Sequence, residues 1–188
     1  ASLAAARNLE EAEKMNQRLR EAVRVDALTG LPSRYALNER VAARVSEDPL
    51  GLIYLDLDGF TAVNRRLGDA GGDRIIQQAA QFLQSKLPGG TELYRHEADE
   101  FVVLLPSGDG HRTVELAKRL RAAMAEAEWP MRSDKPLKLT VAAGVLAWPA
   151  DRPLPEPDAL IEGARAACRH AAHAGGNRLR VLEPGDLV

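Results

Sequence analysis

The sequence contains a single cysteine, Cys168, and this scarcity excludes one class of protein. One thiol cannot form an intramolecular disulfide, so the chain is not a small secreted scaffold held by such bridges. It has no run approaching the ~18 apolar residues of a membrane-spanning helix, and no apolar segment behind a basic start like that of a signal peptide. We therefore expect a cytoplasmic domain, with any anchor in the inner membrane lying outside these residues.

A surplus of basic residues is missing as well. The chain has 25 lysines and arginines against 27 aspartates and glutamates, a net charge of −2 over 188 residues. Because nucleic-acid binding depends on cationic contacts with many phosphates, this balance excludes nucleic acid as the main partner. The length suits one globular domain with one hydrophobic core.

Two common functional motifs are also absent. There is no GxxxxGK[ST] loop, the usual phosphate cradle between a strand and a helix. The histidines do not combine with Cys168 into the spacing of a zinc site; they are His96, His111, His170 and His173. We interpret the last two as solvent-exposed residues of one helix.

The first 25 residues contain neither glycine nor proline, and their many Ala, Glu, Arg and Leu residues predict one helix. Over about three heptads the seam positions repeat, with Leu9, Asn16 and Val23 at one position and Ala5, Ala12 and Leu19 at the other. Two-stranded coiled coils use a central asparagine to fix register, so the segment fits a weak parallel coiled coil. A single exposed helix with a modest apolar stripe explains the pattern equally well.

The remainder alternates between helix and strand patterns. Helices are predicted over 33–45, 60–67, 73–87, 111–127 and 158–174, and strands over 50–57, 92–95, 101–105, 137–148 and 178–182. Ser33 is the expected cap of the first of these helices. The order βααββαβαβ indicates an α/β fold with a mixed central sheet flanked by helices. We assign 26–183 to this domain and 184–188 to a linker, and because the chain begins without Met we expect a longer protein.

Three acidic residues stand at predicted strand ends. Asp56 closes the apolar strand 50–57, and Asp99 and Glu100 lie at the turn between the next two strands. If these strands are neighbours in one sheet, the carboxylates converge at its edge. Oxygen ligands of this kind suit Mg²⁺, and two such ions can promote phosphoryl or nucleotidyl transfer. The alternative is that the acids only solvate the sheet edge.

Several separated motifs together resemble one family. They are Asp26-x-Leu28-Thr29-Gly30-Leu31-Pro32-Ser33-Arg34, Asp56-Leu57-Asp58-Gly59-Phe60-x-x-x-Asn64, Gly72-Asp73, Arg95-His96-Glu97-Ala98-Asp99-Glu100-Phe101 and Gly175-x-Asn177-Arg178. From Asp26 to about Leu182, their order and spacing resemble the GGDEF family of diguanylate cyclases. The resemblance implies a fold like that of polymerase palms and nucleotide cyclases, in which a homodimer brings two GTP molecules together to form cyclic di-GMP.

The resemblance also implies roles for the acidic residues. Asp56, the carbonyl of Leu57 and Asp99 match the family's ligands for Mg²⁺ or Mn²⁺, the expected cofactor when nucleotide is bound. Glu100 matches the adjacent acid, which assists deprotonation of the attacking ribose hydroxyl. Asn64 and Asp73 match the pair that binds the guanine edge, and Phe60 belongs to the same substrate-binding motif.

The family signature itself is altered in this chain. Its two glycines are replaced by Glu97 and Ala98, which add side chains where the family needs space beside the nucleotide. Glu97 also adds a negative charge near the triphosphate. Without a compensating cation, such a pair of charges about 4 Å apart costs roughly 4 kcal/mol at an effective dielectric constant of about 20. We therefore expect the signature to be degenerate.

Cationic phosphate contacts are missing too. The family's lysine and arginine at the end of the last helix correspond to Ala172 and Gly176, and a further lysine corresponds to Thr61. The family's inhibitory product site corresponds to Pro88 and Thr91, so that site is expected to be absent. Together these changes weaken the binding of a triphosphate while leaving the metal and guanine positions intact.

The favoured hypothesis is a degenerate, catalytically inactive GGDEF domain that regulates cyclic di-GMP signalling. It would bind GTP with Mg²⁺ and control an EAL phosphodiesterase domain on its C-terminal side, with a sensor on its N-terminal side and a homodimer in the full-length protein. One alternative is an active cyclase that tolerates the substitutions. The other is a dimerising spacer that binds no nucleotide.

Overall fold

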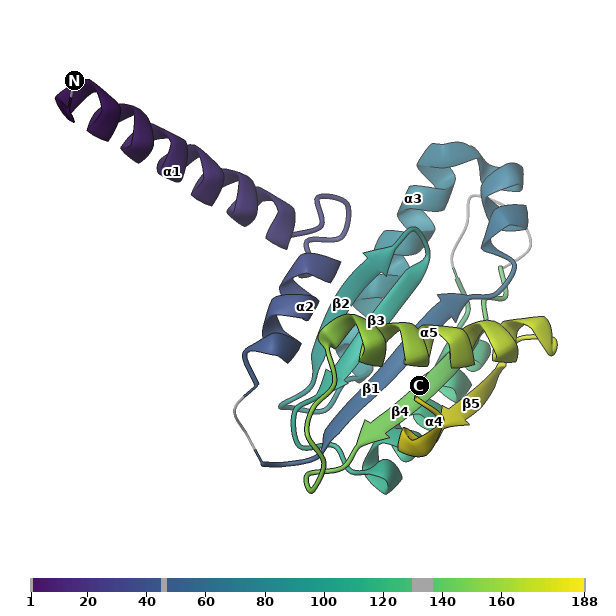
Figure 1. The fold of residues 1–188 in the computed structure, drawn as a ribbon. Helices are drawn as coiled ribbons and strands as arrows, with labels where there is room; N and C mark the ends of the chain where they lie inside the picture. The colour runs from purple at the N-terminus through teal and green to yellow at the C-terminus, as the bar shows by residue number, and fades with distance from the viewer. Residues whose placement is uncertain (1, 45–46, 130–136, 188) are drawn as a thin grey trace.

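The computed structural model describes residues 2–44, 47–129 and 137–187 (Figure 1). Its elements are α1 (Ser2–Arg24), α2 (Arg34–Ala42), β1 (Leu50–Leu57), α3 (Phe60–Lys86), β2 (Glu92–Glu97), β3 (Glu100–Leu105), α4 (Gly110–Glu126), β4 (Val141–Trp148), α5 (Pro157–His173), β5 (Arg178–Leu182) and a short 3₁₀ helix, η1 (Pro184–Asp186). The predicted α/β class and the order of elements are confirmed.

The five strands form one mixed sheet in the order β2-β3-β1-β4-β5. β1 lies in the centre and runs antiparallel to both β3 and β4, whereas β4 and β5 are parallel. Every residue of β1 is buried except Asp56, which is half-buried. The continuous apolar sequence of β1 follows from this position, because helices cover both faces of the strand.

The two faces of the sheet carry separate apolar cores. Alternate residues of β1, such as Leu55, pack against α3 and α4, and the residues between them, such as Leu52, pack against α2 and α5. Helix α1 extends away from both layers (Figure 1). Among the described helices, none has the length and apolar character needed to cross a membrane.

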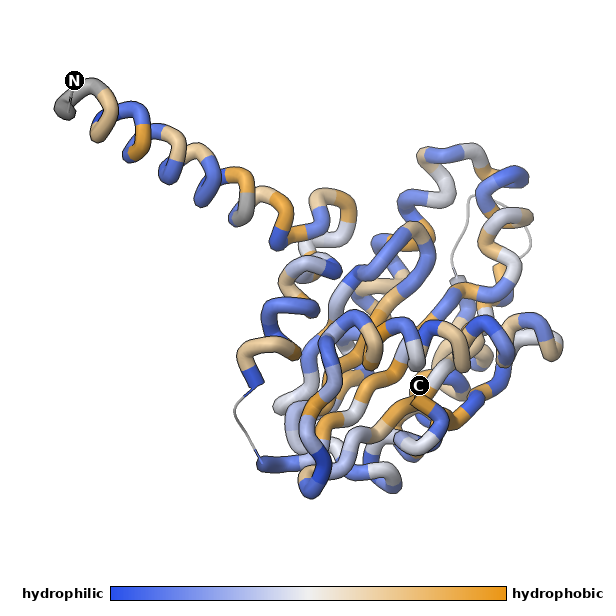
Figure 2. Tube along the Cα trace, in the orientation of Figure 1, coloured by the Kyte–Doolittle hydropathy of each residue, from blue (hydrophilic) through white to orange (hydrophobic). Residues whose placement is uncertain are grey.

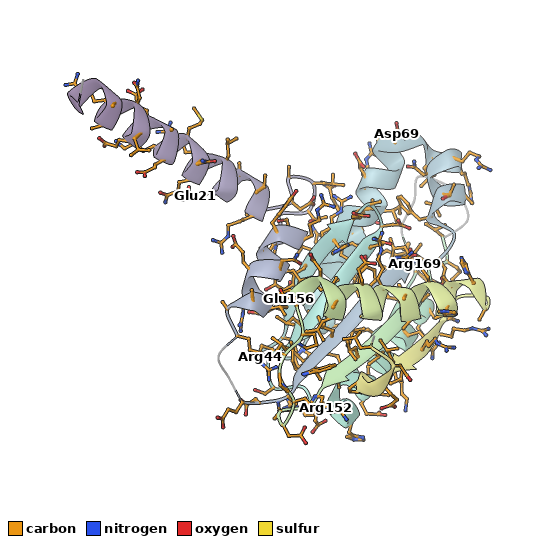
Figure 3. All side chains as sticks on the ribbon, viewed as in Figure 1. Glu21, Arg44, Asp69, Arg152, Glu156 and Arg169 are labelled. Carbon is orange, nitrogen blue, oxygen red and sulfur yellow. The ribbon has the colours of Figure 1, made fainter. Side chains whose placement is uncertain are left out.

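Helix α1 presents its apolar residues to solvent. Leu9 is 62% exposed, Leu19 56% and Val23 45%. Figure 2 shows orange positions recurring along α1 between blue ones, and in Figure 3 its side chains, Glu21 among them, project into open space. The predicted helix is therefore present, and its seam residues are unpaired within the described part of this chain.

Two element boundaries differ from those predicted. The two expected helices between residues 60 and 87 are joined in the single element α3, although Gly68 keeps a non-helical conformation with φ 72° and ψ 173°. Glycine tolerates this break because it has no Cβ. Strand β4 begins at Val141 rather than at Leu137, which instead pairs with Trp129 in an isolated bridge.

The ends of α2 and of the chain also differ in detail. Ser33 occupies the N-cap position of α2 but makes no capping bond, because its hydroxyl donates to the carbonyl of Val23. Val45, at the predicted end of this helix, lies outside the described residues. In the segment expected to be a linker, Leu187 packs beside Gly163 of α5.

Helix α5 lies directly on the backbone of β4. A Cβ atom added to Gly144 would overlap the carbonyl oxygen of Ala164 and lie 2.5 Å from the amide nitrogen of Cys168. Because both atoms belong to the helix backbone, no side-chain rotation could relieve the clash. Glycine at 144 therefore sets the distance between α5 and the sheet.

We expect Gly144→Ala to lower the free energy of unfolding by at least ~3 kcal/mol, because overpacking here must displace a whole helix. Chemical denaturation of the chain measures this change. Gly89→Ala is the control, since a Cβ on Gly89 would meet nothing within 4 Å. Equal stability of the two variants would contradict the close contact between α5 and β4.

Candidate functional site

The acidic residues come together where β1 and β3 lie side by side. Asp56 is paired with Glu100 in the antiparallel register, and the amide of Leu57 donates to the carbonyl of Asp99 at 3.2 Å. The hairpin is tighter than predicted, because β2 continues to Glu97 and β3 begins at Glu100. The expected convergence of the strand ends is thus present in the structure.

Asp56 and Asp99 form a hydrogen-bonded carboxyl pair at this place. Burial, the charge of Asp99 and a hydrogen bond with that residue raise the pKa of Asp56 to about 7. Burial also raises the pKa of Asp99. Two carboxylates held together in a half-buried place repel each other, and a divalent cation would relieve that repulsion. The donor atoms therefore fit the Mg²⁺ or Mn²⁺ suggested by the sequence.

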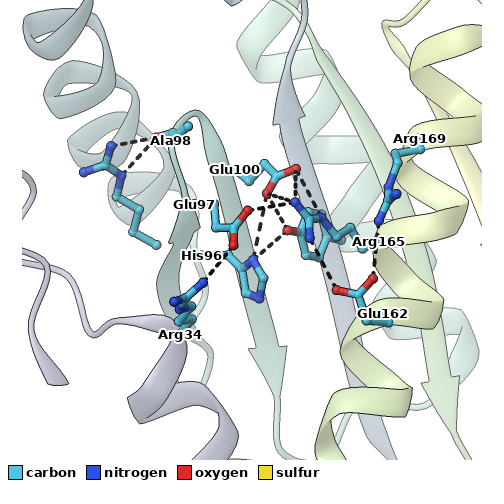
Figure 4. Close-up of polar contacts among 10 residues, drawn as sticks. Arg34, His96, Glu97, Ala98, Glu100, Glu162, Arg165 and Arg169 are labelled. Carbon is cyan, nitrogen blue, oxygen red and sulfur yellow. Dashed lines mark hydrogen bonds and ion pairs between the residues drawn. The ribbon is translucent and has the colours of Figure 1, made fainter. Parts of the chain in front are cut away.

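Glu100 lies beside this pair but has other partners. The Tyr54 hydroxyl donates to its carboxylate at 2.8 Å, and the Arg165 guanidinium contacts both carboxylate oxygens at 3.1 and 3.3 Å (Figure 4). Burial acts to raise the pKa of Glu100, but hydrogen bonds from His96, Tyr54 and Arg165 hold it below its ordinary value. Glu100 is therefore a fixed, ionised carboxylate bound to an internal cation.

Glu97 is also paired, which corrects the expectation of an uncompensated charge. One carboxylate oxygen lies 2.8 Å from Arg34 at the start of α2, and the other lies 2.9 Å from Arg165 of α5 (Figure 4). The two cations were not anticipated because they lie outside the family's phosphate-binding positions. The condition on which the predicted cost depended, a Glu97 carboxylate without a compensating cation, is therefore not met in the structure.

The trio His96, Glu97 and Glu100 places three possible ligand atoms within 4.8 Å of one another. Both carboxylates are already bound by Arg165, however, and His96 lies 2.8 Å from the Tyr54 hydroxyl. We therefore assign no metal to this trio.

The backbone of the hairpin tip is strained. Ala98 has a φ of 37°, a left-handed conformation that glycine adopts readily and alanine does not. The Arg95 side chain donates to the Ala98 carbonyl at 2.7 and 3.0 Å and to both carboxylate oxygens of Asp26 at 3.0 Å. The tip is thus held in a conformation that favours glycine, and it is tied to the segment that follows α1.

The residues expected to bind guanine lie on the two parts of α3. Asn64 and Phe60 pack against Gly72, where an added Cβ would overlap the Asn64 side-chain oxygen. Asp73 follows on the exposed surface, and Asn64 makes a long 3.4 Å contact with Asp69. The close packing at Gly72 brings the first turn of α3 beside Asp73 and leaves both polar side chains accessible.

The two positions expected to contact phosphate, Ala172 in the last turn of α5 and Gly176 just after the helix, carry no charge. Ala172 packs against the apolar core on its side of the sheet. Gly176 has a φ of 68°, and a Cβ there would lie 2.5 Å from the carboxylate of Asp58. A long side chain at 176 would therefore be strained as well as crowded.

Asp58 has a structural role that the sequence did not reveal. Its carboxylate accepts hydrogen bonds from the Thr140 hydroxyl and from the Asn177 amide, both at 2.7 Å. These bonds join the end of β1 to the loop between α5 and β5. The two acids of the Asp56-Leu57-Asp58 segment therefore have different roles. Asp56 belongs to the carboxyl pair with Asp99, whereas Asp58 stabilises the loop.

The remaining predicted positions lie away from the acids. Thr91 donates to the carbonyl of Pro88 in the turn before β2, at the end of that strand opposite to Ala98. Arg34, Tyr54 and Arg165 were missed at the sequence level, since no motif connects a helix arginine to a strand-end acid. Tyr54 had one usable signal, its position two residues before Asp56 on the same face of β1.

We expect Ala98→Gly to raise the free energy of unfolding by about 0.5–1 kcal/mol, because relief of the left-handed strain exceeds the entropic cost of glycine. Urea denaturation measures the change. Ala127→Gly, at a position with φ −65°, should lower stability by about 0.5–1 kcal/mol. A loss of stability in both variants would show that Ala98 is not strained.

We expect Asp56→Asn to become more stabilising as the pH rises. In the folded wild type Asp56 keeps a proton that the unfolded chain releases near pH 4. Proton binding by Asp56 therefore stabilises the folded wild type at low pH, and this stabilisation is lost as the pH rises through about 7. In chelator, the Tm difference between variant and wild type should therefore grow from pH 5 to pH 8. Asp151→Asn, which removes a carboxylate at an exposed loop position, is the control, and an equal growth of its Tm difference would contradict the prediction.

The chain matches the family model described as "Diguanylate cyclase, GGDEF domain" over residues 23–178. It is 34% identical over 167 residues to Diguanylate cyclase DgcP of Pseudomonas aeruginosa, covering 86% of this chain and 24% of that protein. It is 30% identical over 186 residues to Cyclic di-GMP phosphodiesterase NbdA of the same organism, covering 96% and 23%. The chain thus spans about a quarter of the length of these relatives.

Solved structures share the fold. A sensory box/GGDEF family protein from Caulobacter crescentus is 32% identical with a TM-score of 0.71, covering 81% of this chain and 99% of that one. The GGDEF domain of PA1120 from Pseudomonas aeruginosa is 27% identical with a TM-score of 0.76, covering 86% and 96%. Sequence, fold and the strand-end acids agree, and the chain belongs to the GGDEF domain family.

Proposed function

We propose that this GGDEF domain is a regulatory module of cyclic di-GMP signalling that binds GTP with Mg²⁺ or Mn²⁺ and has little or no cyclase activity. One contrast carries the proposal. The acidic pair Asp56 and Asp99 is intact and suited to a cation, whereas the phosphate end of the site offers only Ala172 and a conformationally restricted Gly176. Weak phosphate binding with retained metal and guanine residues favours a sensor of nucleotide over an efficient enzyme.

The relatives support a place within a larger signalling protein. One matched protein is named as a diguanylate cyclase and another as a cyclic di-GMP phosphodiesterase, and this chain corresponds to about a quarter of each. A domain of this family can thus accompany either activity. We propose an EAL domain on the C-terminal side, a sensor on the N-terminal side, and a cytoplasmic location for this domain of a protein anchored in the inner membrane.

Helix α1 supports a homodimer in the full-length protein. Leu9, Leu19 and Val23 are exposed at the seam positions that the heptad pattern assigns to them. A second α1 would bury this stripe, and the small Ala5 and Ala12 would keep the pairing weak by itself. Such a dimer could change its geometry when the attached sensor changes state.

Nucleotide would act on the neighbouring domain through linkage. The proposed Mg²⁺ or Mn²⁺ supplies positive charge for the phosphates when bound, Asp56 and Asp99 hold it, and Asn64 and Asp73 bind the guanine edge. The effect requires only that GTP bind one arrangement of the two domains more tightly than another.

The second candidate is an active cyclase. The compensation of Glu97 by Arg34 and Arg165 favours this alternative, since the signature then presents no free negative charge to the phosphates. The metal and guanine positions are the same for both candidates. Turnover, not binding, therefore distinguishes them.

We expect calorimetry with GTP and Mn²⁺ to show saturable binding that depends on the metal, while chromatography detects no steady formation of cyclic di-GMP. Asn64→Ala should weaken binding at least ~10-fold, because the loss of a buried hydrogen bond to the base costs about 1.4 kcal/mol or more. Ala172→Lys should strengthen it, since the added cation lies at the family's phosphate position.

Arg152→Ala is the matched control and should bind as the wild type does, because Arg152 lies in the exposed loop before α5 (Figure 3). Steady turnover to cyclic di-GMP would establish the second candidate instead. If neither binding nor product is observed, the domain is a dimerising spacer and the proposal is wrong.

A further inference from the structure

Arg165 is the central cation of the site. Projecting from α5, its guanidinium lies 2.9 Å from Glu97, 3.1 Å from Glu100 and 3.4 Å from Glu162 (Figure 4). It therefore joins the middle of the helix to both ends of the hairpin turn. Its partner Glu100 stands opposite Asp56 in the sheet register, so the guanidinium contacts the residue beside the carboxyl pair.

The contact with Glu100 is shielded from solvent. The side chain of Arg165 is 22% exposed and that of Glu100 is 14% exposed, whereas Glu97 is 40% exposed. Coulomb interactions are screened less in such a half-buried place than at the surface. The Arg165–Glu100 pair is consequently the stronger part of the cluster, and its removal would leave a half-buried carboxylate without its cation.

The charge of Glu100 acts on the acidic pair. Glu100 and Asp56 are directly opposed residues of β3 and β1, so their side chains lie on the same face of the sheet and the two negative charges are neighbours. A negative charge that disfavours a carboxylate favours a metal cation at the same place. The Arg165 guanidinium compensates the charge of Glu100, which it contacts at 3.1 Å. Glu100 belongs to a compact group with His96 and Glu97, whose polar side-chain atoms lie within 4.8 Å of one another.

We propose that Arg165 is an internal counter-cation that holds the hairpin tip against α5 and opposes the binding of a divalent ion at Asp56 and Asp99. The inference concerns regulation of the same site and rests on the proposed metal binding. When Arg165 contacts Glu100, the negative charge beside the Asp56–Asp99 pair is partly cancelled. When Arg165 leaves Glu100, that negative charge is restored.

The cluster allows this exchange without loss of the fold. Glu97 keeps its second cation, Arg34, at 2.8 Å, and Glu100 keeps its hydrogen bond from Tyr54. A surface pocket of about 240 Å³ lies beside Arg34, Glu97 and Arg165, so the guanidinium has space into which it can move. Arg165 is therefore a positioning residue whose loss should open the site and not dismantle it.

Titration of the whole chain with Mn²⁺ alone, at pH 8 and without nucleotide, tests the proposal by calorimetry. Arg165→Gln should bind Mn²⁺ about fivefold more tightly than wild type, the factor that corresponds to ~1 kcal/mol of charge coupling. Arg165→Lys retains the charge and should remain close to wild type. The gain in Arg165→Gln should disappear when Glu100→Gln is added.

Arg169→Gln is the matched control. Arg169 lies one turn further along α5, and its guanidinium is directed toward Glu162, which it contacts at 3.3 Å (Figure 4). Its loss should leave Mn²⁺ affinity within twofold of wild type. If Arg169→Gln gained as much Mn²⁺ affinity as Arg165→Gln, the change in net charge alone would explain the gain, and the proposal would be overturned.

Hydrogen exchange gives a second readout. The amides of 98–100 should exchange about fivefold faster in Arg165→Gln than in wild type, as expected for ~1 kcal/mol of lost coupling, and Mn²⁺ should slow them again. Unchanged or weaker Mn²⁺ affinity in Arg165→Gln, or no binding by either protein, overturns the proposal. If wild type still binds GTP with Mn²⁺ and Asn64→Ala does not, the proposed function survives and only the role of Arg165 is wrong.

Discussion

The burial of β1 between two helical layers is the constraint on which the site depends. Its effect is visible in one exception, because Asp56 is the half-buried residue of an otherwise buried strand. The β1–β3 register places Asp56 opposite Glu100, and its carboxyl is hydrogen-bonded to that of Asp99. The raised pKa of Asp56 is a consequence of this half-buried position beside other acids.

The negative charges around that pair are balanced within the domain. The cations come from Arg34 and Arg165 and contact the protein's own carboxylates, Glu97 and Glu100. Positive charge that could hold a phosphate is thus taken up by internal ion pairs. This arrangement is compatible with a domain that responds to metal and nucleotide more readily than it converts them.

Much of the fold and part of the site could be predicted from sequence. The unbroken apolar run over 50–57 predicted the strand β1, and the positions of Asp99 and Glu100 at a turn predicted that they would converge with Asp56 if their strands were neighbours in one sheet. The Arg165–Glu97 pair could not be predicted, because 68 residues separate its members. No sequence periodicity or motif indicates which acid an arginine on a helix surface will contact. The conformation of Ala98 was also hidden, since alanine gives no local signal of a positive φ.

The contact at Gly144 has a mechanical consequence for the site. Because the backbone of α5 rests on β4 with no side chain between them, helix and sheet behave as one rigid body. The hairpin turn, in contrast, is held to α5 by the side chain of Arg165 and to α2 by that of Arg34, and such side-chain contacts can be exchanged for others. Any widening of the site must therefore come from the turn, with α5 as the fixed reference against which it moves.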